Sequence, residues 1–593
     1  MSQLKSIAVL PFENMSSDPE NEYFSDGMTE EITNALCRIE GLKVSARTSA
    51  FAFKNKKEDV RIIGNQLGVS AVIEGSIRKS GDRVRISTQL IRTDNGFLMW
   101  NETFDRRLTD IFDLQDEISL LIADKIRENF GHLDIQDHLV DNSTQNIEAY
   151  ELFLKAVYHL RRKDFNDIQL ALDLFKQVVA LDPDYAEAYA YMGETYLHYT
   201  GFNLMPVDDG YEQVKECANK ALSIDPNDAK AHKLKAYSSL FYDWDWDMAI
   251  SAYNKAIENG LSSDNEFISY YYIFIQKDYE EAIKIAQESV KKDPMHVLSY
   301  WQLGICYYFA AKHKEAIQAF ERCLEIDENF SEAFRWIGVN YGYLGKFDRA
   351  FQYVDRALEI TQGEGLAQID RLTIRILNGE TDSVIHDIEA TEYIDPCDPA
   401  QLYSLLQMPE KAIPLLQQGL HKRSVMMVTL KHYWIWDNLR SEPGFEEILN
   451  AMNFGQQKSH KSHQATAQLV PASQFNMTDG EIDSLLQRLN TTMSDEDQVV
   501  DHNMTLRTLA ELLEVHPNKL SWILNEKLGR NFNEYINELR LEIFKEKALD
   551  KNYAHLSILG LAYESGFTSK SVFNDYFKKK TGHTPKAWIK INS

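Results

Sequence analysis

The sequence predicts a multidomain chain with an α/β N-terminal domain, an all-α solenoid of repeated helix pairs, and an all-α C-terminal domain. Three observations point to this fold class. Strand and helix patterns alternate over residues 6–130, a regular repeat follows, and two similar pairs of short helices end the chain. With 593 residues, 44% of them hydrophobic, the chain is large enough to bury several separate cores.

The net charge is −27, from 63 Lys and Arg against 90 Asp and Glu. Taken as a whole, this charge argues against a nucleic-acid binder, because DNA and RNA repel an acidic surface. The charge is unevenly distributed, however. Residues 501–593 hold 14 basic and 11 acidic residues, so their net charge is +3 and that of residues 1–500 is −30. Residues 551–593 alone hold 7 basic and 2 acidic residues, which concentrates positive charge near the C-terminal end.

The five cysteines form no C-x-x-C pair, which favours a reducing compartment and argues against structural zinc. No segment approaches the roughly 20 apolar residues that cross a bilayer. The apolar run at residues 7–12 is far too short for the hydrophobic part of a signal peptide. We therefore expect a cytoplasmic protein with no membrane partner, no metal and no cofactor.

Within the N-terminal domain, residues 7–12 predict a first buried strand. Amphipathic patterns predict helices at residues 22–39, 60–67 and 111–129. Two further alternating runs flank Asp94-Asn95-Gly96, where Asn-Gly supplies the positive φ values of a tight hairpin. No phosphate-binding loop pattern follows a strand here, so we expect turn and packing roles for the local glycines, Gly64, Gly68 and Gly75.

The segments PFENMSSDPENEYFSDGMTEEI, GLKVSARTSAFAFK and AVIEGSIRKSGDRVRISTQLI make residues 1–131 resemble the TolB-N-like domain, which precedes tetratricopeptide arrays in some bacterial regulators and cyclase-linked proteins. The resemblance implies a non-catalytic α/β module. No nucleophile elbow, HExxH motif, Walker loop or carboxylate pair in a motif context occurs in the chain. We therefore expect no catalytic residues and no enzyme.

The repeat is clearest where Asp293, Asp327 and Thr361 end successive units that are 34 residues apart. In the same frame Gly304 recurs as Gly338, and small residues of this kind allow two helices to approach closely. The pattern resembles the tetratricopeptide repeat over residues 146–452, with less regular units at both ends. The resemblance implies a surface that binds a peptide or another protein. Cys306 and Cys323 occupy repeat positions that face neighbouring helices, so we expect both to be buried.

Residues 453–477 are polar and without a helical or strand period, which predicts a linker before a final domain at residues 478–593. Thr478 is expected to cap a helix at residues 481–489. Two similar units follow, TLRTLAELLEVHPNKLSWILNEKLG and SILGLAYESGFTSKSVFNDYFKKKTG, with FNEYINELRLEIFKEKALD as a connecting helix. Each unit has a capping Thr505 or Ser557, a short helix, a turn and a second helix. This is the helix-turn-helix plan, in which the second helix lies in the DNA major groove.

The segments LAELLEV, LSWILNEKLG, YINELRLE and LAYESGFTSKSVFNDYFKKKTGHTP resemble the AraC-family DNA-binding domain over residues 478–591. The resemblance implies a sequence-specific transcription regulator whose two units enter successive major-groove segments. The base contacts that it implies are Asn518, Ser521, Trp522 and Asn525 in the first unit and Ser569, Lys570, Ser571 and Asn574 in the second. Lys578, Lys579 and Lys580 are expected to bind phosphates.

These residue types suit DNA, because Asn can pair with adenine and Lys can donate to guanine. The residues expected to face inward are Leu520, Ile523 and Leu524 in the first unit and Val572, Phe573 and Phe577 in the second. Asp575 departs from the family pattern, because many members have a basic residue there. A carboxylate at this position would repel phosphate or accept a hydrogen bond from cytosine.

The expected partners are double-stranded promoter DNA and a protein or peptide on the repeat array. Two input mechanisms stay open: the acidic body shields DNA until a partner binds the solenoid, or the array forms a homodimer. The alternative function is a protein-interaction scaffold whose AraC-like domain no longer binds DNA specifically, for which Asp575 is the strongest clue.

Overall fold

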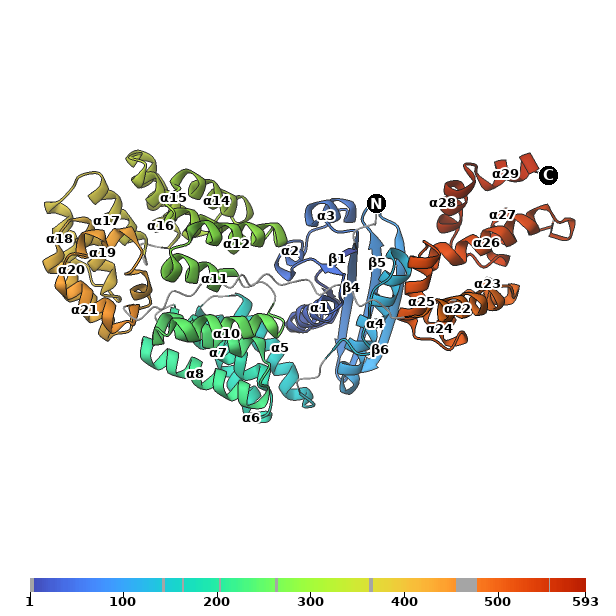
Figure 1. Ribbon diagram of the computed structural model, residues 1–593, viewed down its shortest axis with the longest axis horizontal. Helices are drawn as coiled ribbons and strands as arrows, with labels where there is room; N and C mark the ends of the chain where they lie inside the picture. Colours follow the sequence, from blue (N-terminus) through green and yellow to red (C-terminus); the bar gives the residue numbers. More distant parts are fainter. Residues whose placement is uncertain are drawn as a thin grey trace.

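The computed structural model describes residues 5–140, 144–162, 165–201, 204–261, 265–361, 366–454, 477–553 and 555–592. Figure 1 shows an elongated molecule in which the N-terminal α/β domain lies between the helical array and the C-terminal helical domain. Residues 455–476, which make up most of the expected linker, lie outside the described residues. The predicted fold class, an α/β domain followed by two all-α regions, is confirmed.

The N-terminal domain is built on one mixed sheet with the strand order β3-β1-β4-β5-β6, and β2 pairs with β4. Strand β1 is parallel to β3 and β4, whereas β4, β5 and β6 form an antiparallel meander. The strands are β1 (Ser6–Val9), β2 (Glu13–Asn14), β3 (Lys43–Val44), β4 (Ala71–Ser80), β5 (Arg83–Arg92) and β6 (Leu98–Arg107).

Helices cover both faces of this sheet. Alternate residues of β1 point to opposite faces and therefore pack against different helices. Ile7 and Val9 belong to the core beneath α1 and α4, whereas Ala8 and the following Leu10 belong to the core beneath α2 and α3. The helical elements are η1 (Pro19–Asn21), α1 (Glu22–Cys37), α2 (Arg47–Phe51), α3 (Val60–Leu67), η2 (Leu108–Asp110) and α4 (Ile111–Phe130).

The expected helices of this domain are confirmed to within two residues at each end, and α2 is an addition that the pattern did not predict. The first strand ends at Val9 rather than residue 12, although Leu10 and Phe12 are still buried. In the hairpin between β5 and β6, only Gly96 has a positive φ, of 75°. The loop is longer than a two-residue turn, because the Arg92 amide donates to the Phe97 carbonyl.

The array consists of antiparallel helix pairs from α5 to α21, interrupted by π-helical turns at η3 and η4 and by 3-10 turns at η5 and η6. Its elements are α5 (Ile147–Arg162), α6 (Phe165–Leu181), α7 (Ala186–Gly201), α8 (Val207–Ile224), α9 (Ala229–Ser238), η3 (Ser239–Asp243), α10 (Trp246–Glu258), α11 (Asn265–Tyr271), η4 (Tyr272–Gln276), α12 (Tyr279–Lys292), α13 (Val297–Phe309), α14 (His313–Ile326), α15 (Ser331–Tyr343), α16 (Phe347–Ile360), α17 (Ala367–Leu377), α18 (Asp382–Ala390), α19 (Cys397–Leu405), α20 (Pro409–His421), η5 (Val425–Thr429), η6 (Trp434–Leu439) and α21 (Pro443–Ala451).

The repeat period predicted from sequence is confirmed, because Asp293, Asp327 and Thr361 each follow the last residue of a unit's second helix. Cys306 and Cys323 are fully buried, as expected. A methyl group added at Gly338 would lie 2.9 Å from the Ala350 carbonyl oxygen, which explains why a glycine recurs where the two helices of a unit cross.

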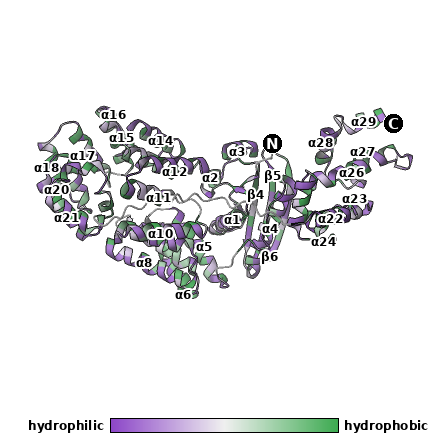
Figure 2. Ribbon diagram, viewed as in Figure 1, coloured by the Kyte–Doolittle hydropathy of each residue, from purple (hydrophilic) through white to green (hydrophobic). Residues whose placement is uncertain are grey.

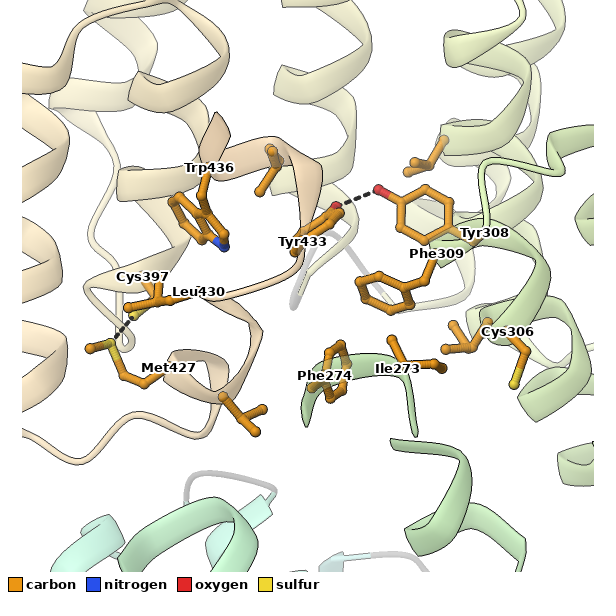
Figure 3. Packing of buried hydrophobic residues seen from close by; sticks show 14 of the residues in the cluster. Ile273, Phe274, Cys306, Tyr308, Phe309, Cys397, Met427, Leu430, Tyr433 and Trp436 are labelled. Atoms are coloured by element: carbon orange, nitrogen blue, oxygen red, sulfur yellow. Dashed lines mark hydrogen bonds between the residues drawn. The ribbon is translucent and has the colours of Figure 1, made fainter. Parts of the chain in front are cut away.

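The C-terminal part of the array packs against units that precede it by more than a hundred residues. The hydroxyl of Tyr433 is hydrogen-bonded to that of Tyr308, and the two side chains point toward each other in Figure 3. Phe454 stacks on Trp246 with ring centroids 4.7 Å apart. The apolar core of the array therefore continues to Phe454 at its C-terminal end.

The core of the N-terminal domain does not stop at the boundary expected near residue 131. One cluster of buried residues runs from Ile7 in β1 through α1, α4 and α5 to Leu234 in α9. Buried polar contacts follow the same path, because Gln115 in α4 donates to the Tyr150 hydroxyl in α5. The first repeats and the α/β domain therefore share a core.

Figure 2 shows hydrophobic and hydrophilic residues interspersed along the helices throughout the molecule. Among the described residues, no helix is both long and apolar enough to cross a membrane.

We expect Gly338→Ala to destabilise the array relative to Gly201→Ala by about 1–3 kcal/mol, the usual cost of overpacking. Gly338 lies inside α15 and Gly201 is the last residue of α7, so Gly338→Ala gains more helix propensity, whereas a methyl group at Gly201 meets no atom of the described residues within 4 Å. A loss of stability in Gly338→Ala relative to Gly201→Ala therefore reports the close contact. Hydrogen exchange of peptides from α15 and α16 measures the effect, and equal protection in both variants would show that the crossing tolerates a side chain.

Candidate nucleic-acid interface

The C-terminal domain contains two helix-turn-helix units joined by one long helix. Its elements are α22 (Asp479–Thr492), α23 (Glu496–Val500), α24 (Leu506–Leu512), α25 (Pro517–Trp522), η8 (Ile523–Lys527), α26 (Phe532–Leu549), η9 (Lys551–Tyr553), α27 (Ile558–Glu564), α28 (Lys570–Thr581) and α29 (Pro585–Asn592). The first unit is α24 with α25 and its π-helical continuation η8, and the second is α27 with α28. Thr478, Thr505 and Ser557 cap their helices as predicted.

Each unit has a small apolar core, and α26 contributes to both. The first core contains the fully buried Leu520, Ile523 and Leu524, so the inward positions expected of this recognition helix are confirmed. The turns have left-handed residues at their centres, Glu514 with φ 50° and Gly566 with φ 91°. Because α26 contributes residues to both cores, it connects the two recognition helices directly.

The recognition helix α28 of the second unit is accessible over its polar face. Lys570, Lys578 and Lys579 are exposed, whereas Ser569 at the N-cap position and Asn574 are half-buried. The Asn574 amide nitrogen donates one hydrogen bond to the Lys570 carbonyl at 2.9 Å, which leaves its second N–H and its oxygen for another partner. Ser571 belongs to α28, and its side chain lies outside the described part of the chain.

Charges on this helix are not all equally available. Lys580 Nζ lies 3.6 Å from a Glu538 carboxylate oxygen on α26, so part of its charge is already compensated. Asp575 is exposed on the same helix, where its carboxylate would repel a nearby phosphate. Lys578 and Lys579 are therefore the stronger candidates for phosphate contacts.

The expectation that Val572 faces inward is wrong, because 44% of its surface is exposed. The neighbouring Phe573 is buried, as expected, with its ring 4.7 Å from that of Phe544 and 5.0 Å from that of Phe567. Phe577 is also buried, as expected. Adjacent residues of a helix point about 100° apart, so positions 572 and 573 cannot both lie at the centre of its buried face.

The recognition helix α25 of the first unit lies against the N-terminal domain, beside α4 in Figure 1. Two of its expected base contacts are buried there: Asn518 is 5% exposed and Ser521 is 1% exposed. Trp522 and Asn525 are half-buried, and the Asn525 amide donates to the Ser521 carbonyl at 2.8 Å. In this structure the first unit does not present its reading face to solvent.

Asn518 makes hydrogen bonds with both ends of its amide. Its oxygen accepts from a guanidinium nitrogen of Arg127, and its nitrogen donates to Asp134 and to the Ile135 carbonyl, the latter at 3.1 Å. The Arg127 side chain is almost completely buried between α4 and the first unit, and Asp124 is its ion-pair partner. Burial lowers the pKa of the Arg127 guanidinium below its ordinary range, and the Asp124 carboxylate opposes this effect.

Sequence reasoning missed the remaining residues of this contact. The Leu506 amide donates to Glu128 at 3.1 Å, and Arg507 donates to Asp124 at 3.1 Å. Farther along, the side chains of Asn531 and Asn533 donate to the backbone and side-chain oxygens of Asn129. These partners are separated by 378 to 404 residues along the chain, so no local pattern could reveal them.

Within the described residues, no group of three or more His, Cys, Asp or Glu side chains could hold a metal ion. The chemistry that the exposed residues offer is hydrogen bonding and charge pairing.

Comparisons with known families match three separate parts of the chain. A model described as a helix-turn-helix domain matches residues 509–591, and a tetratricopeptide repeat model matches residues 272–329. A model described as the second domain of HilA/YgeH-like transcriptional regulators matches residues 2–121. The chain thus combines an AraC-type helix-turn-helix domain with tetratricopeptide repeats, and the resemblance of its N-terminal domain to TolB-N-like domains stays a prediction.

Two curated relatives are similar to parts of the chain. A Rhizobium meliloti (strain 1021) protein named "Putative adenylate cyclase 3" is 38% identical over 185 residues, which are 31% of each chain. The transcriptional regulator HilA of Salmonella paratyphi A is 22% identical over 316 residues, 51% of this chain and 54% of that protein. The chain therefore spans from about a third to about half of the length of these relatives.

A solved structure of YrrB, described as a tetratricopeptide protein with an unusual peptide-binding site, covers 33% of this chain and 97% of its own at 19% identity. The TM-score is 0.23, which is too low to support an argument about this chain.

We expect Phe573→Ala to destabilise the second unit by about 3–5 kcal/mol, because truncating a buried aromatic leaves a cavity. The adjacent Val572→Ala is the matched control and should change stability by no more than about 0.5 kcal/mol. Hydrogen exchange of α27 and α28 in the full chain measures both. Equal effects of the two substitutions would contradict the assignment of which side chain is buried.

Proposed function

We propose that this protein is a sequence-specific regulator of transcription that binds double-stranded DNA through its C-terminal domain. In this proposal the two recognition helices, α25 and α28, enter successive major-groove segments on one face of the duplex. The observation that carries the proposal is the pair of helix-turn-helix units on a single connecting helix, α26. Such an arrangement lets one chain contact a site that proteins with a single motif bind as dimers.

The second unit offers the chemistry that this function needs. Lys570 is exposed at the first position of α28, where it can donate to guanine O6 and N7. Asn574 lies one turn later on the same face, and its oxygen and second N–H can pair with adenine. Lys578 and Lys579 extend the positive surface toward the end of the helix, where they would neutralise phosphates.

The N-terminal domain and the array supply the input in this proposal. Tetratricopeptide repeats present helix faces that bind peptides or other proteins, and the array shares a core with the α/β domain. A partner bound to the first repeats would therefore act on the α/β domain as well. A homodimer formed through the array would be a second route for input.

The interaction scaffold is the rival function. It is supported by the exposed Asp575 on α28 and by the burial of Asn518 in the first unit. Selection of bound sequences from random duplex DNA by the full-length protein, followed by mapping of bound sites on its own genome, separates the two functions. Recovery of no preferred sequence at low salt would favour the scaffold.

We expect Lys570→Ala and Asn574→Ala each to weaken binding to the selected site by about 5- to 150-fold, since a base-contacting pair contributes about 1–3 kcal/mol of discrimination. Binding to unrelated DNA should change less, because base contacts carry the sequence preference. Fluorescence anisotropy with both duplexes measures the two affinities. An equal loss on both duplexes would place these side chains on phosphates rather than on bases.

We expect Lys579→Ala to weaken binding to all sequences by a similar factor and to reduce the slope of log K against log salt by about 1. The matched control is Lys422→Ala, which removes the same charge from an exposed position just after α20 in the array. A salt titration of binding by the two variants measures the slopes. Identical slopes would show that Lys579 does not contact the duplex.

A further inference from the structure

The N-terminal domain and DNA would compete for the same surface of the first unit. Asn518 has its amide oxygen and nitrogen both engaged by the N-terminal domain, so neither is left to pair with the edge of adenine. Ser521 is 1% exposed, and its hydroxyl makes no hydrogen bond within the described part of the chain. A base pair cannot approach either side chain while the N-terminal domain covers α25.

Carboxylates of the N-terminal domain occupy positions where the first unit would otherwise meet phosphates. Glu128 accepts from the Leu506 amide, and Asp124 accepts from the Arg507 guanidinium. Backbone amides and arginines of this kind are common phosphate contacts in protein–DNA complexes. Asp137 lies 3.5 Å from the ring of His516, at the residue before α25. Negative charge therefore faces this unit along the surface that would follow the duplex.

The contact is specific in shape as well as in charge. The buried Arg127 depends on Asn518 and Asp124 for its hydrogen bonds, because burying an unpaired guanidinium is costly. A methyl group at Gly131 would lie 2.8 Å from the Asn525 amide oxygen, so a Cβ at this position would require the Asn525 side chain to shift. The left-handed φ of 106° at Gly131 also favours glycine.

The second unit has no such cover in the described residues, since Lys570, Lys578 and Lys579 stay exposed on α28. The two units of this domain therefore differ in availability within one structure. A chain in this state could contact DNA through α28 and could not place α25 in the adjacent major-groove segment.

We propose that the N-terminal domain inhibits DNA recognition in cis, with α4 and residues 131–137 covering the first recognition helix and their carboxylates standing in place of phosphates. This inference rests on the proposed function, because it concerns the regulation of the same DNA-binding surface. Full binding requires the first unit to leave α4. The apparent affinity of the chain is then lower than that of the open form by the fraction of molecules that are open.

The direct test weakens the cover without altering any residue that faces DNA. The triple variant Asp124→Asn, Glu128→Gln, Asp134→Asn removes three carboxylates from the N-terminal side of the contact. The matched control, Asp82→Asn, Glu102→Gln, Asp113→Asn, removes the same three charges from exposed positions of the same domain. Any gain in DNA affinity that comes only from weaker charge repulsion should appear in both variants.

We expect the triple variant to bind the selected site at least about tenfold more tightly than the control, as a mostly closed population predicts. At protein concentrations that saturate the site, hydroxyl-radical footprints of both variants should include the segment bound by the first unit, about one helical turn or roughly 10 base pairs, because DNA selects the open form. Hydrogen exchange of the α25 peptide should rise in the free triple variant. Unchanged exchange in β4 and β5 shows that the N-terminal domain remains folded.

A second variant shifts the equilibrium between the closed and the open form toward the closed form. Asn129 and Asn533 contact each other across the junction, with their amide nitrogen and oxygen 2.9 Å apart. A reducible bis-methanethiosulfonate cross-link between the two thiols of Asn129→Cys, Asn533→Cys should shorten the footprint and weaken binding to the selected site about tenfold or more, and reduction should restore both.

Equal affinity of the triple variant and its control, with exchange showing that α25 has opened, would overturn the inhibition. Wild-type affinity and footprint in the cross-linked cysteine variant would also overturn it. A different result addresses the proposed function: if neither wild type nor the opened triple variant binds any duplex at low salt, DNA recognition itself is refuted, and the inhibition with it.

Discussion

Helix α4 is buried on two sides, and both of its interfaces bear on function. One side, with residues such as Ile118 and Ile122, belongs to the core that the α/β domain shares with the first repeats. The other side presents Asp124, Arg127 and Glu128 to the C-terminal domain. A helix with apolar residues on one face and paired charges on another is well suited to this position, because the apolar face supplies stability and the polar face supplies specificity. The position of the first recognition helix relative to the rest of the molecule depends on this arrangement.

The polar side of α4 forms an interface whose contacts can be replaced by contacts with water or DNA. Hydrogen bonds to charged groups contribute about 1.5–3 kcal/mol each when they are made, and leaving a buried charge without a partner costs more. When the first unit leaves, however, water can solvate Asp124, Arg127 and Glu128, and DNA can replace the carboxylates opposite Arg507 and Leu506. The difference in free energy between the closed and the DNA-bound state is therefore much smaller than the summed free energies of the contacts. A contact made mainly of polar pairs can act as a switch where a large apolar interface would not.

Local sequence patterns predicted most of the elements and only part of the candidate site. The helix caps at Thr478, Thr505 and Ser557 and the 34-residue spacing of Asp293, Asp327 and Thr361 depend on neighbouring residues, and all were predictable. Val572 was misplaced because two adjacent apolar residues compete for one inward position at the start of α28. The burial of Asn518 could not be predicted, since its partners Arg127 and Asp134 lie more than 380 residues away and form no motif with it.

The distribution of charge acquires a more specific meaning from the contact at α4. A body with a net charge of −30 repels DNA at long range, but screening limits that repulsion to about 8 Å at physiological salt. The carboxylates of Asp124 and Glu128 act at contact distance, where screening by salt is weak. The array contacts the other end of α4, because Phe112 of this helix packs edge-on against Tyr150 of α5 with ring centroids 4.9 Å apart. A displacement of α5 would therefore act on the helix whose opposite end covers the first recognition helix, which gives a signal at the repeats a physical route to the DNA-binding surface.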